Sequence, residues 1–163
     1  MGGSITKDAA LKAAHWLEVA HDFDLPVLFL CDTPGVMPGP DAERAGTLKA
    51  AGEFYKAQAK LKSPKLHITL RKAFGFGSSL MAMNPFDKQT ITLAFPNASL
   101  GAMPAAPGAK TAKMSEEDAT ALAMQVEGAW HGADNVAFDR IIDPRDIRLE
   151  LGKALSLSRS GKI

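Results

Sequence analysis

Apolar residues along the chain follow two spacings, one helical and one continuous. Between Thr6 and Phe23 they recur every three or four positions, which predicts a helix with one buried face. The members of that face are Ala10, Ala13, Ala14, Leu17 and Ala20. The run PVLFLCD, which begins at Pro26, is continuously apolar, as in a strand buried on both faces. KLHITLR and TITLAF are two further predicted strands. This alternation of helices with short apolar strands favours an α/β fold with a largely parallel sheet.

The segment between the first two predicted strands contains a loop and a helix. DTPGVMPGPD, residues 32–41, holds three prolines and two glycines, which is typical of a loop. Asp41 is the predicted N-cap of a helix over residues 42–62. We expect the apolar stripe of this helix to include Leu48, Tyr55 and Ala59.

The second half of the chain consists of shorter predicted elements. SLGAM predicts a short fourth strand, and PAAPGAKTAK, residues 104–113, predicts a loop. Ser115 with Asp118 is typical of a cap for the helix SEEDATALAMQVEGAWH. AFDRIID leads into a last helix over about residues 145–159. Parallel sheets usually begin on a strand, whereas this chain opens on a helix, so we expect the first strands of its fold to be missing, as in an N-terminal truncation.

The length fits a single domain over residues 1–163. The 19 Lys and Arg residues nearly balance 18 Asp and Glu, which argues against binding to nucleic acid or an anionic membrane surface. No apolar run approaches the ~18 residues of a spanning helix, and a cytoplasmic protein is expected. The single cysteine, Cys31, lies in an apolar run and is interpreted as a buried core thiol. No metal site is expected, because motifs such as H-E-x-x-H and C-x-x-C are absent from the sequence.

The stretch RKAFGFGSSLMAM, residues 71–83, places two glycines and two serines directly after a predicted strand. A phosphate-binding loop is disfavoured, because Leu80 stands where a dinucleotide fingerprint needs its third glycine. A serine nucleophile remains open at Ser78, although Gly77 occupies the serine position of G-x-S-x-G and His67 is better explained as a core residue. An oxyanion hole fits better, because backbone N–H groups of a glycine-rich turn can converge on one point.

Asp32 ends the strand before the DTPG loop. We expect its carboxylate to accept hydrogen bonds from the backbone N–H groups of that loop, as in an Asx-turn, and not to act in catalysis.

Several segments in order resemble the carboxyltransferase β-subunit family of biotin-dependent acyl-CoA carboxylases, such as propionyl-CoA carboxylase. The similar stretches are GGSITKDAALKAAHWLEVAHDFDLPVLFLCDTPGVMPGPDAERAG, SPKLHITLRKAFGFGSSLMA, LAFPNASLGAMPAAPGA and DRIIDPRDIR. The resemblance is to the C-terminal domain, which belongs to the crotonase/ClpP superfamily, and it covers roughly residues 2–150. It implies a fold of repeated β-β-α turns wound into a superhelix, apparently truncated at its N-terminus here.

The resemblance also implies a function and a site. The implied activity is transfer of CO2 from carboxybiotin, held on a separate carrier protein, to an acyl-CoA. The backbone amides of Phe76 and Gly77 would polarise the ureido oxygen, with Gly75 shaping the turn. Ser78 would start the following helix, and Ser79 would line the pocket that selects the acyl chain. The DTPG loop, with Thr33, Pro34 and Gly35, would lie near the same cleft.

The resemblance has departures that bear on activity. Residues 1–163 resemble no part of the family's N-terminal, CoA-binding domain. Lys49-Ala50 stands where the family often has Arg-His, and Ile147 replaces the usual Thr. The implied partners are therefore a CoA-binding carboxyltransferase chain and a biotin carrier or biotin carboxylase subunit, and a homo-oligomer is expected. Two alternatives stay open: a diverged or truncated crotonase-fold protein with a binding or assembly role and no activity alone, and a weak hydrolase that uses Ser78.

Overall fold

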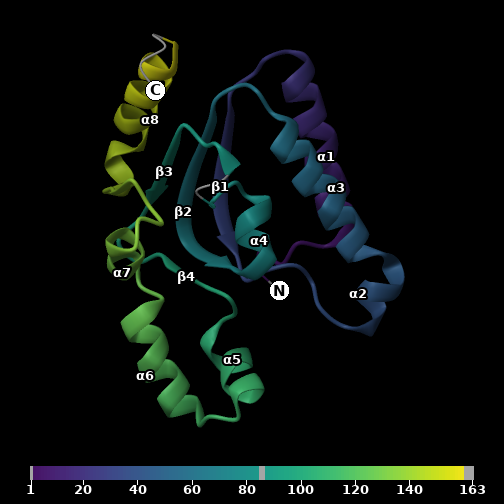
Figure 1. Cartoon of the computed structure of the whole chain (residues 1–163), viewed down its shortest axis with the longest axis vertical. Helices are drawn as coiled ribbons and strands as arrows, with labels where there is room; N and C mark the ends of the chain where they lie inside the picture. The colour runs from purple at the N-terminus through teal and green to yellow at the C-terminus, as the bar shows by residue number, and fades with distance from the viewer. Residues whose placement is uncertain (1, 85–86, 160–163) are drawn as a thin grey trace.

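A five-stranded parallel sheet forms the centre of the chain in the computed structural model, which describes residues 2–84 and 87–159 (Figure 1). The strands are β1 (Val27–Thr33), β2 (Lys65–Phe74), β3 (Ile91–Ala94), β4 (Ser99–Gly101) and β5 (Arg140–Ile141). Their order is β1-β2-β3-β5, and β4 pairs with the far end of β2. Each pairing is parallel, which confirms the predicted sheet, including the short strand at SLGAM.

Helices cover the two faces of this sheet unequally. The helices are α1 (Lys7–Asp22), α2 (Pro40–Ala45), α3 (Thr47–Lys60), α4 (Gly75–Leu80), α5 (Ala105–Ala112), α6 (Glu116–Val126), α7 (Ala129–Asp134), the 3-10 turn η2 (Pro144–Asp146) and α8 (Ile147–Arg159). α1 and α3 lie side by side and bury Phe29 of β1, whereas Ile147 and Leu151 of α8 pack near Ile68 and Leu93 on the opposite face (Figure 1). On that second face, Leu28 and Leu30 of β1 stay exposed.

The first helix agrees closely with its prediction. Thr6 is the N-cap, and its side chain accepts a hydrogen bond from the Ala9 N–H at 3.3 Å. Ala10, Ala14 and Leu17 are buried, as the spacing predicts. The small alanines of α1 share one core with Ala50 and Ala51 of α3, so the two helices can approach closely.

The single helix predicted over residues 42–62 is wrong in two respects. Gly46, with φ of 82°, ends α2 and divides the segment into two helices, and Gly39, not Asp41, is the N-cap of α2. The predicted stripe fails at Leu48 and Ala59, which are exposed, whereas Tyr55 is partly buried and packs against the core as expected. The face that packs against α1 instead carries Ala50, Ala51, Phe54 and Ala57.

The loop predicted over residues 104–113 is helix α5, because Pro104 is its N-cap and the alanines that follow favour helix over loop. The cap predicted for α6 is confirmed, since Ser115 Oγ accepts a hydrogen bond from the Asp118 N–H at 3.0 Å. α7 separates from α6 at Gly128, so the predicted helix is divided here too. Within residues 2–84 and 87–159, no helix has the length and apolar character needed to cross a membrane.

Ile68 tests the packing of the sheet. Ile68→Ala should lower the free energy of unfolding by about 3 kcal/mol, because Ile68 is fully buried against Leu93 and Ile142. Urea denaturation followed by circular dichroism measures the change. Leu28→Ala, an exposed position on the same face, is the matched control and should cost less than about 1 kcal/mol. Equal losses from the two variants would contradict this account of the core.

Candidate functional site

Near its carboxyl end, β2 contains a bulge, because it has two more residues than β1 between the same two pairing positions. Cys31 pairs with Thr69, yet Thr33 pairs with Ala73, so β2 advances four positions while β1 advances two. This bulge contains Leu70, Arg71 and Lys72, opposite Asp32. Bulges bend a strand and re-aim the chain that follows. Here the chain that follows is the glycine turn, Gly75–Ser79, at the edge of the sheet where parallel strands end (Figure 1).

The glycine turn and the DTPG loop touch backbone to backbone. A methyl group at Gly77 would lie 2.8 Å from the Cα of Gly35 and 3.0 Å from Cγ2 of Thr33. Gly35, with φ of 125°, faces the Phe74 carbonyl, so the contact has glycine on both sides. The structure therefore brings Gly77 against Thr33 and Gly35, which precede it by more than 40 residues in the sequence.

The start of α4 leaves backbone donors without a side-chain partner. The first N–H groups of any helix lack an intrahelical acceptor, and no side chain caps α4. Gly75 makes the turn possible with φ of 55°, and a methyl group there would lie 2.9 Å from the Ala102 carbonyl oxygen. Phe76 and Gly77, the predicted oxyanion residues, thus lie in an uncapped first turn. Because α4 has only six residues, its N–H groups and not a helix dipole are the chemically useful feature.

The other predicted site residues lie around this turn. Ser78 Oγ donates to the Gly75 carbonyl oxygen at 2.8 Å and so stabilises the turn. Ser79 and Pro34 are half-buried. Phe76 is 40% exposed as a residue, and its ring lies 5.9 Å, centroid to centroid, from the Tyr55 ring of α3.

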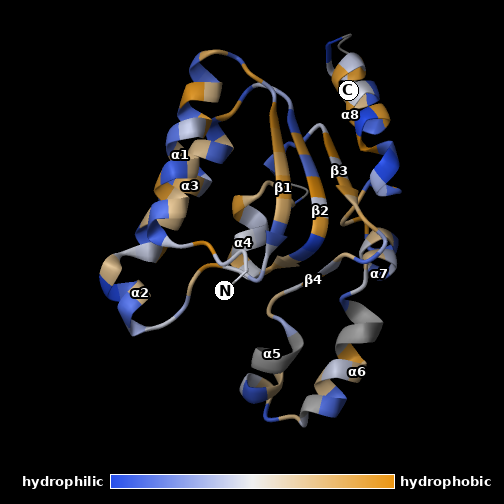
Figure 2. Ribbon diagram, turned by 180° about the vertical axis from the view of Figure 1, so that it is seen from behind, coloured by the Kyte–Doolittle hydropathy of each residue, from blue (hydrophilic) through white to orange (hydrophobic). Residues whose placement is uncertain are grey.

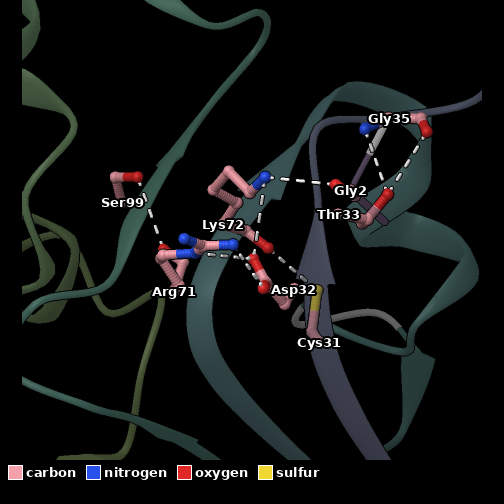
Figure 3. A network of polar contacts seen from close by, with 8 residues as sticks. All are labelled: Gly2, Cys31, Asp32, Thr33, Gly35, Arg71, Lys72 and Ser99. Atoms are coloured by element: carbon pink, nitrogen blue, oxygen red, sulfur yellow. Dashed lines mark hydrogen bonds and ion pairs between the residues drawn. The ribbon is translucent and has the colours of Figure 1, made fainter. Parts of the chain in front are cut away.

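The DTPG loop is braced by Thr33 and not, as predicted, by Asp32. Thr33 Oγ1 accepts a hydrogen bond from the Gly35 N–H at 3.1 Å and donates one to the Gly35 carbonyl at 3.2 Å (Figure 3). The Asp32 carboxylate instead faces the bulge, where Arg71 Nη2 lies 3.0 Å from Oδ2. The Asx-turn expectation was wrong because the arginine, 39 residues away in sequence, is the stronger partner.

A base for a Ser78 nucleophile is not supplied by His67. Its Nδ1 donates to the Met81 carbonyl at 2.6 Å, so Nε2 accepts from the Thr69 hydroxyl at 2.8 Å. Burial lowers the pKa of His67 to about 4, which keeps the ring neutral near pH 7. The core interpretation of this histidine is confirmed.

Cys31 is a core thiol, as predicted. It is fully buried, and burial raises the pKa of its thiol to about 12, so the reactive thiolate is absent at neutral pH. Its Sγ–H donates weakly to the Lys72 carbonyl at 3.5 Å. Within the described parts of the chain, no three His, Cys, Asp or Glu residues come close enough to hold a metal ion.

Arg71 and Lys72 were not among the site residues expected from the sequence, and Tyr55 was expected only in the apolar stripe of its helix. A signal for the first two was present, since opposite charges stand at the ends of two neighbouring parallel strands, immediately before two glycine loops. Figure 2 shows β1 hydrophobic along most of its length, and both strands hydrophilic at the positions of these charges. Tyr55 carried no comparable signal, because its neighbour Phe76 comes from a distant element.

A shallow pocket of about 440 Å³ lies between the start of α1 and the loop into α2, lined among others by Thr6, Met37 and Pro40. None of the eight predicted site residues lines it. The backbone donors of the turn are therefore outside this pocket.

The whole chain, residues 1–163, matches the family model described as "Carboxyl transferase domain". It is 30% identical, over its full length, to the biotin-dependent long chain acyl-coenzyme A carboxylase beta4 subunit of Mycobacterium tuberculosis, of which the match covers 34%. The beta subunit of P. aeruginosa geranyl-CoA carboxylase superposes with a TM-score of 0.90 at 28% identity, covering 95% of this chain and 32% of that one.

A transcarboxylase 12S structure, solved as a hexamer with methylmalonyl-coenzyme A bound, superposes with a TM-score of 0.88 at 26% identity. It is matched over 96% of this chain and 32% of its own. The expected crotonase-type α/β fold is confirmed by these superpositions. The chain spans about a third of the length of the relatives that it matches.

The close contact at Gly77 predicts a sharp asymmetry between two helical glycines. Gly77→Ala should lower the free energy of unfolding by about 1–3 kcal/mol, since the new methyl group meets backbone that cannot yield. Gly52→Ala, in α3 with no atom within 4 Å of the added methyl, should raise it by about 0.5–1 kcal/mol. Thermal unfolding compares the two, and a stabilised Gly77→Ala would contradict the contact.

The neutral, buried His67 predicts a pH dependence. The folded-state pKa of about 4 lies below the ordinary value of 6.5, so the unfolded chain binds more protons between these values. His67 should therefore cost stability as the pH falls from about 6.5 to 4, by on the order of 2–3 kcal/mol in total. Urea unfolding of wild type and His67→Gln at pH 7 and pH 4.5 measures this. Parallel losses in both proteins would show that His67 does not contribute.

Proposed function

Since the chain belongs to the carboxyl transferase domain family, we propose that it is the biotin-facing component of a carboxyltransferase that moves CO2 from carboxybiotin to an acyl-CoA. The observation that carries the proposal is the close packing of the glycine turn on the DTPG loop, with Gly77 against Gly35. Two motifs of the family resemblance thereby meet at one edge of the sheet, next to uncapped backbone donors.

The residues present fit a ureido group. Bound carboxybiotin would supply the carboxyl group and, once decarboxylated, the basic nitrogen for the substrate proton. The N–H groups of Phe76 and Gly77 would donate to the ureido oxygen, and such preorganised donors contribute most where charge develops. Gly75 and Ser78 shape and hold the turn, through its φ of 55° and the 2.8 Å hydrogen bond. Thr33, Pro34, Gly35 and Ser79 would form the adjacent walls.

No side-chain nucleophile or base is needed in this reaction. That suits a site in which the Ser78 hydroxyl is engaged with Gly75 and His67 is buried with both ring nitrogens occupied. These contacts also weigh against the hydrolase alternative, which needs a free hydroxyl beside a base.

The acyl-CoA side of the site would come from another polypeptide segment. The relatives are about three times as long as this chain. We therefore propose a CoA-binding carboxyltransferase chain and a biotin carrier or biotin carboxylase subunit as partners. Assembly with further copies of the chain is proposed as well, because the related transcarboxylase 12S forms a hexamer. The proposed compartment is the cytoplasm, which suits a lone, buried, unpaired cysteine.

A second candidate is a protein of this fold that only binds or assembles. It is favoured by the exposed Leu28 and Leu30 on a sheet face that α8 covers only in part. The two candidates differ in whether an added CoA-binding segment restores chemistry.

Reconstitution separates these candidates. The chain is mixed with the part of the M. tuberculosis relative that it does not match, together with biotin and a carboxylated acyl-CoA such as methylmalonyl-CoA. Biotin-dependent loss of the carboxyl group is expected in the mixture and in neither component alone, because the two halves of the site lie on different chains. The same segment joined to its own natural remainder is the positive control. Transfer by that control but not by the mixture would refute the enzymatic proposal.

A further inference from the structure

Asp32, Arg71 and Lys72 meet at the bulge of β2 and have no part in the proposed chemistry. We propose that these three residues form a charge clamp that sets the position of the glycine turn against the DTPG loop. They are positioning residues, since they act through the turn and not on the substrate. The geometric part of this inference stands on the structure alone, and its kinetic part rests on the proposed function.

The clamp has one carboxylate between two cations. Arg71 donates through Nε to Asp32 Oδ1 at 3.3 Å and through Nη2 to Oδ2 at 3.0 Å, a two-pronged pairing that fixes orientation (Figure 3). Lys72 Nζ lies 4.0 Å from Asp32 Oδ1. The carboxylate is thus held from the two consecutive residues at which β2 departs from its register with β1.

The backbone of the bulge is held from both sides. The Arg71 carbonyl accepts a hydrogen bond from Ser99 Oγ of β4 at 3.4 Å, and the Lys72 carbonyl accepts the Cys31 thiol of β1 (Figure 3). A bulge leaves residues outside the regular ladder, so side-chain contacts must replace the missing backbone bonds. The clamp supplies that replacement between β1 and β2.

Lys72 also reaches the N-terminal segment. Its Nζ donates to the Gly2 carbonyl at 3.2 Å, and the neighbouring Gly3 packs so closely that a methyl group there would overlap the Asp32 carbonyl oxygen. Further along, Ile5 donates its N–H to the Gly35 carbonyl at 3.0 Å. The clamp therefore joins three segments: the end of β1, the bulge and residues 2–5.

The clamp is close in sequence to both sides of the glycine contact. Asp32 precedes Gly35 by three residues, and Lys72 precedes Gly75 by three. Because only three residues separate the clamp from each glycine segment, a shift of one strand relative to the other at the clamp would also displace the Gly35–Gly77 contact. Since Gly35 and Gly77 have no side chains of their own to absorb a displacement, we expect the turn to move together with the bulge.

Position and stability should respond differently to loss of the clamp. The side chains of Arg71, Asp32 and Lys72 are 60%, 34% and 27% exposed, and exposed ion pairs add little to stability. Misplacing a catalytic donor by about 1 Å, in contrast, can lower a rate on the order of 100-fold. A small effect on the melting temperature with a large effect at the turn is the signature of the clamp.

Hydrogen–deuterium exchange of the full chain tests the geometry. Arg71→Gln should speed exchange of the amides of residues 81–83, which donate to the carbonyls of residues 77–79 of the turn, about tenfold while lowering the melting temperature by less than about 3 °C. Arg145→Gln is the matched control, because Arg145 makes a similar two-pronged pair with Asp143, at 2.9 and 2.7 Å, far from the turn along the chain. The control should leave the turn unchanged. Unchanged exchange in Arg71→Gln overturns the clamp.

Charge exchange provides a rescue. Asp32→Lys alone places three cations together and should speed exchange at the turn further, whereas Asp32→Lys with Arg71→Glu restores an ion pair and should recover most of the wild-type protection. Failure of the double variant to improve on Asp32→Lys, with both proteins folded by circular dichroism, counts against the clamp.

Kinetics in the reconstituted mixture provide the functional test. Arg71→Gln should lower kcat by roughly 10- to 100-fold and leave KM for the acyl-CoA within about twofold, because only the placement of the donors changes. A raised KM with an unchanged kcat overturns the positioning role. If the wild-type mixture transfers no carboxyl group, that failure counts against the proposed function alone, and amide exchange still decides the clamp.

Discussion

The approach of two main chains at Gly35 and Gly77 is the constraint on which the site depends. A methyl group at Gly77 would lie only 2.8 Å from the Gly35 Cα, and Gly35 itself has a φ of 125°, which disfavours any side chain there. The β2 bulge, the hydrogen bonds of Thr33 to Gly35 and the packing of Gly75 beneath Ala102 all serve this contact. A parallel sheet supplies the frame, because it brings the carboxyl ends of β1 and β2 to one edge.

Apolar and charged residues occupy different parts of the strands. The middle of the sheet is held by burial, with Ile68 and Leu93 fully enclosed, and the buried His67 is tolerated because both ring nitrogens have partners. At the carboxyl ends the pattern changes to exposed charge. The buried middle of the strands therefore provides most of the stability, and the charged carboxyl ends position the loops. Residues at these ends can change without removing apolar contacts from the core.

The spacing of apolar residues correctly predicted the features of the fold that depend on neighbouring residues in the sequence. The α1 face, the parallel strands and the Ser115 cap followed from spacing and capping alone, and the glycine turn was located from composition. Contacts between distant segments were not predicted. Asp32 was assigned to its own loop because its partner, Arg71, lies 39 residues away in the sequence. Leu48 was assigned to the core because the sequence of α3 alone does not show that its alanine face is the one packed against α1. The break at Gly46 was equally hidden, since a glycine within a helical pattern does not reveal its φ.

The donors offered by this turn belong to the main chain, and that has a consequence for how the protein can vary. Substitutions at Phe76 or Ser79 alter shape around the turn and leave every N–H in place, so a scan of side chains would overlook the groups with the chemical role proposed here. The positions of the N–H groups depend instead on the backbone conformation that the glycines allow. Substitutions of those glycines would therefore be expected to move the donors.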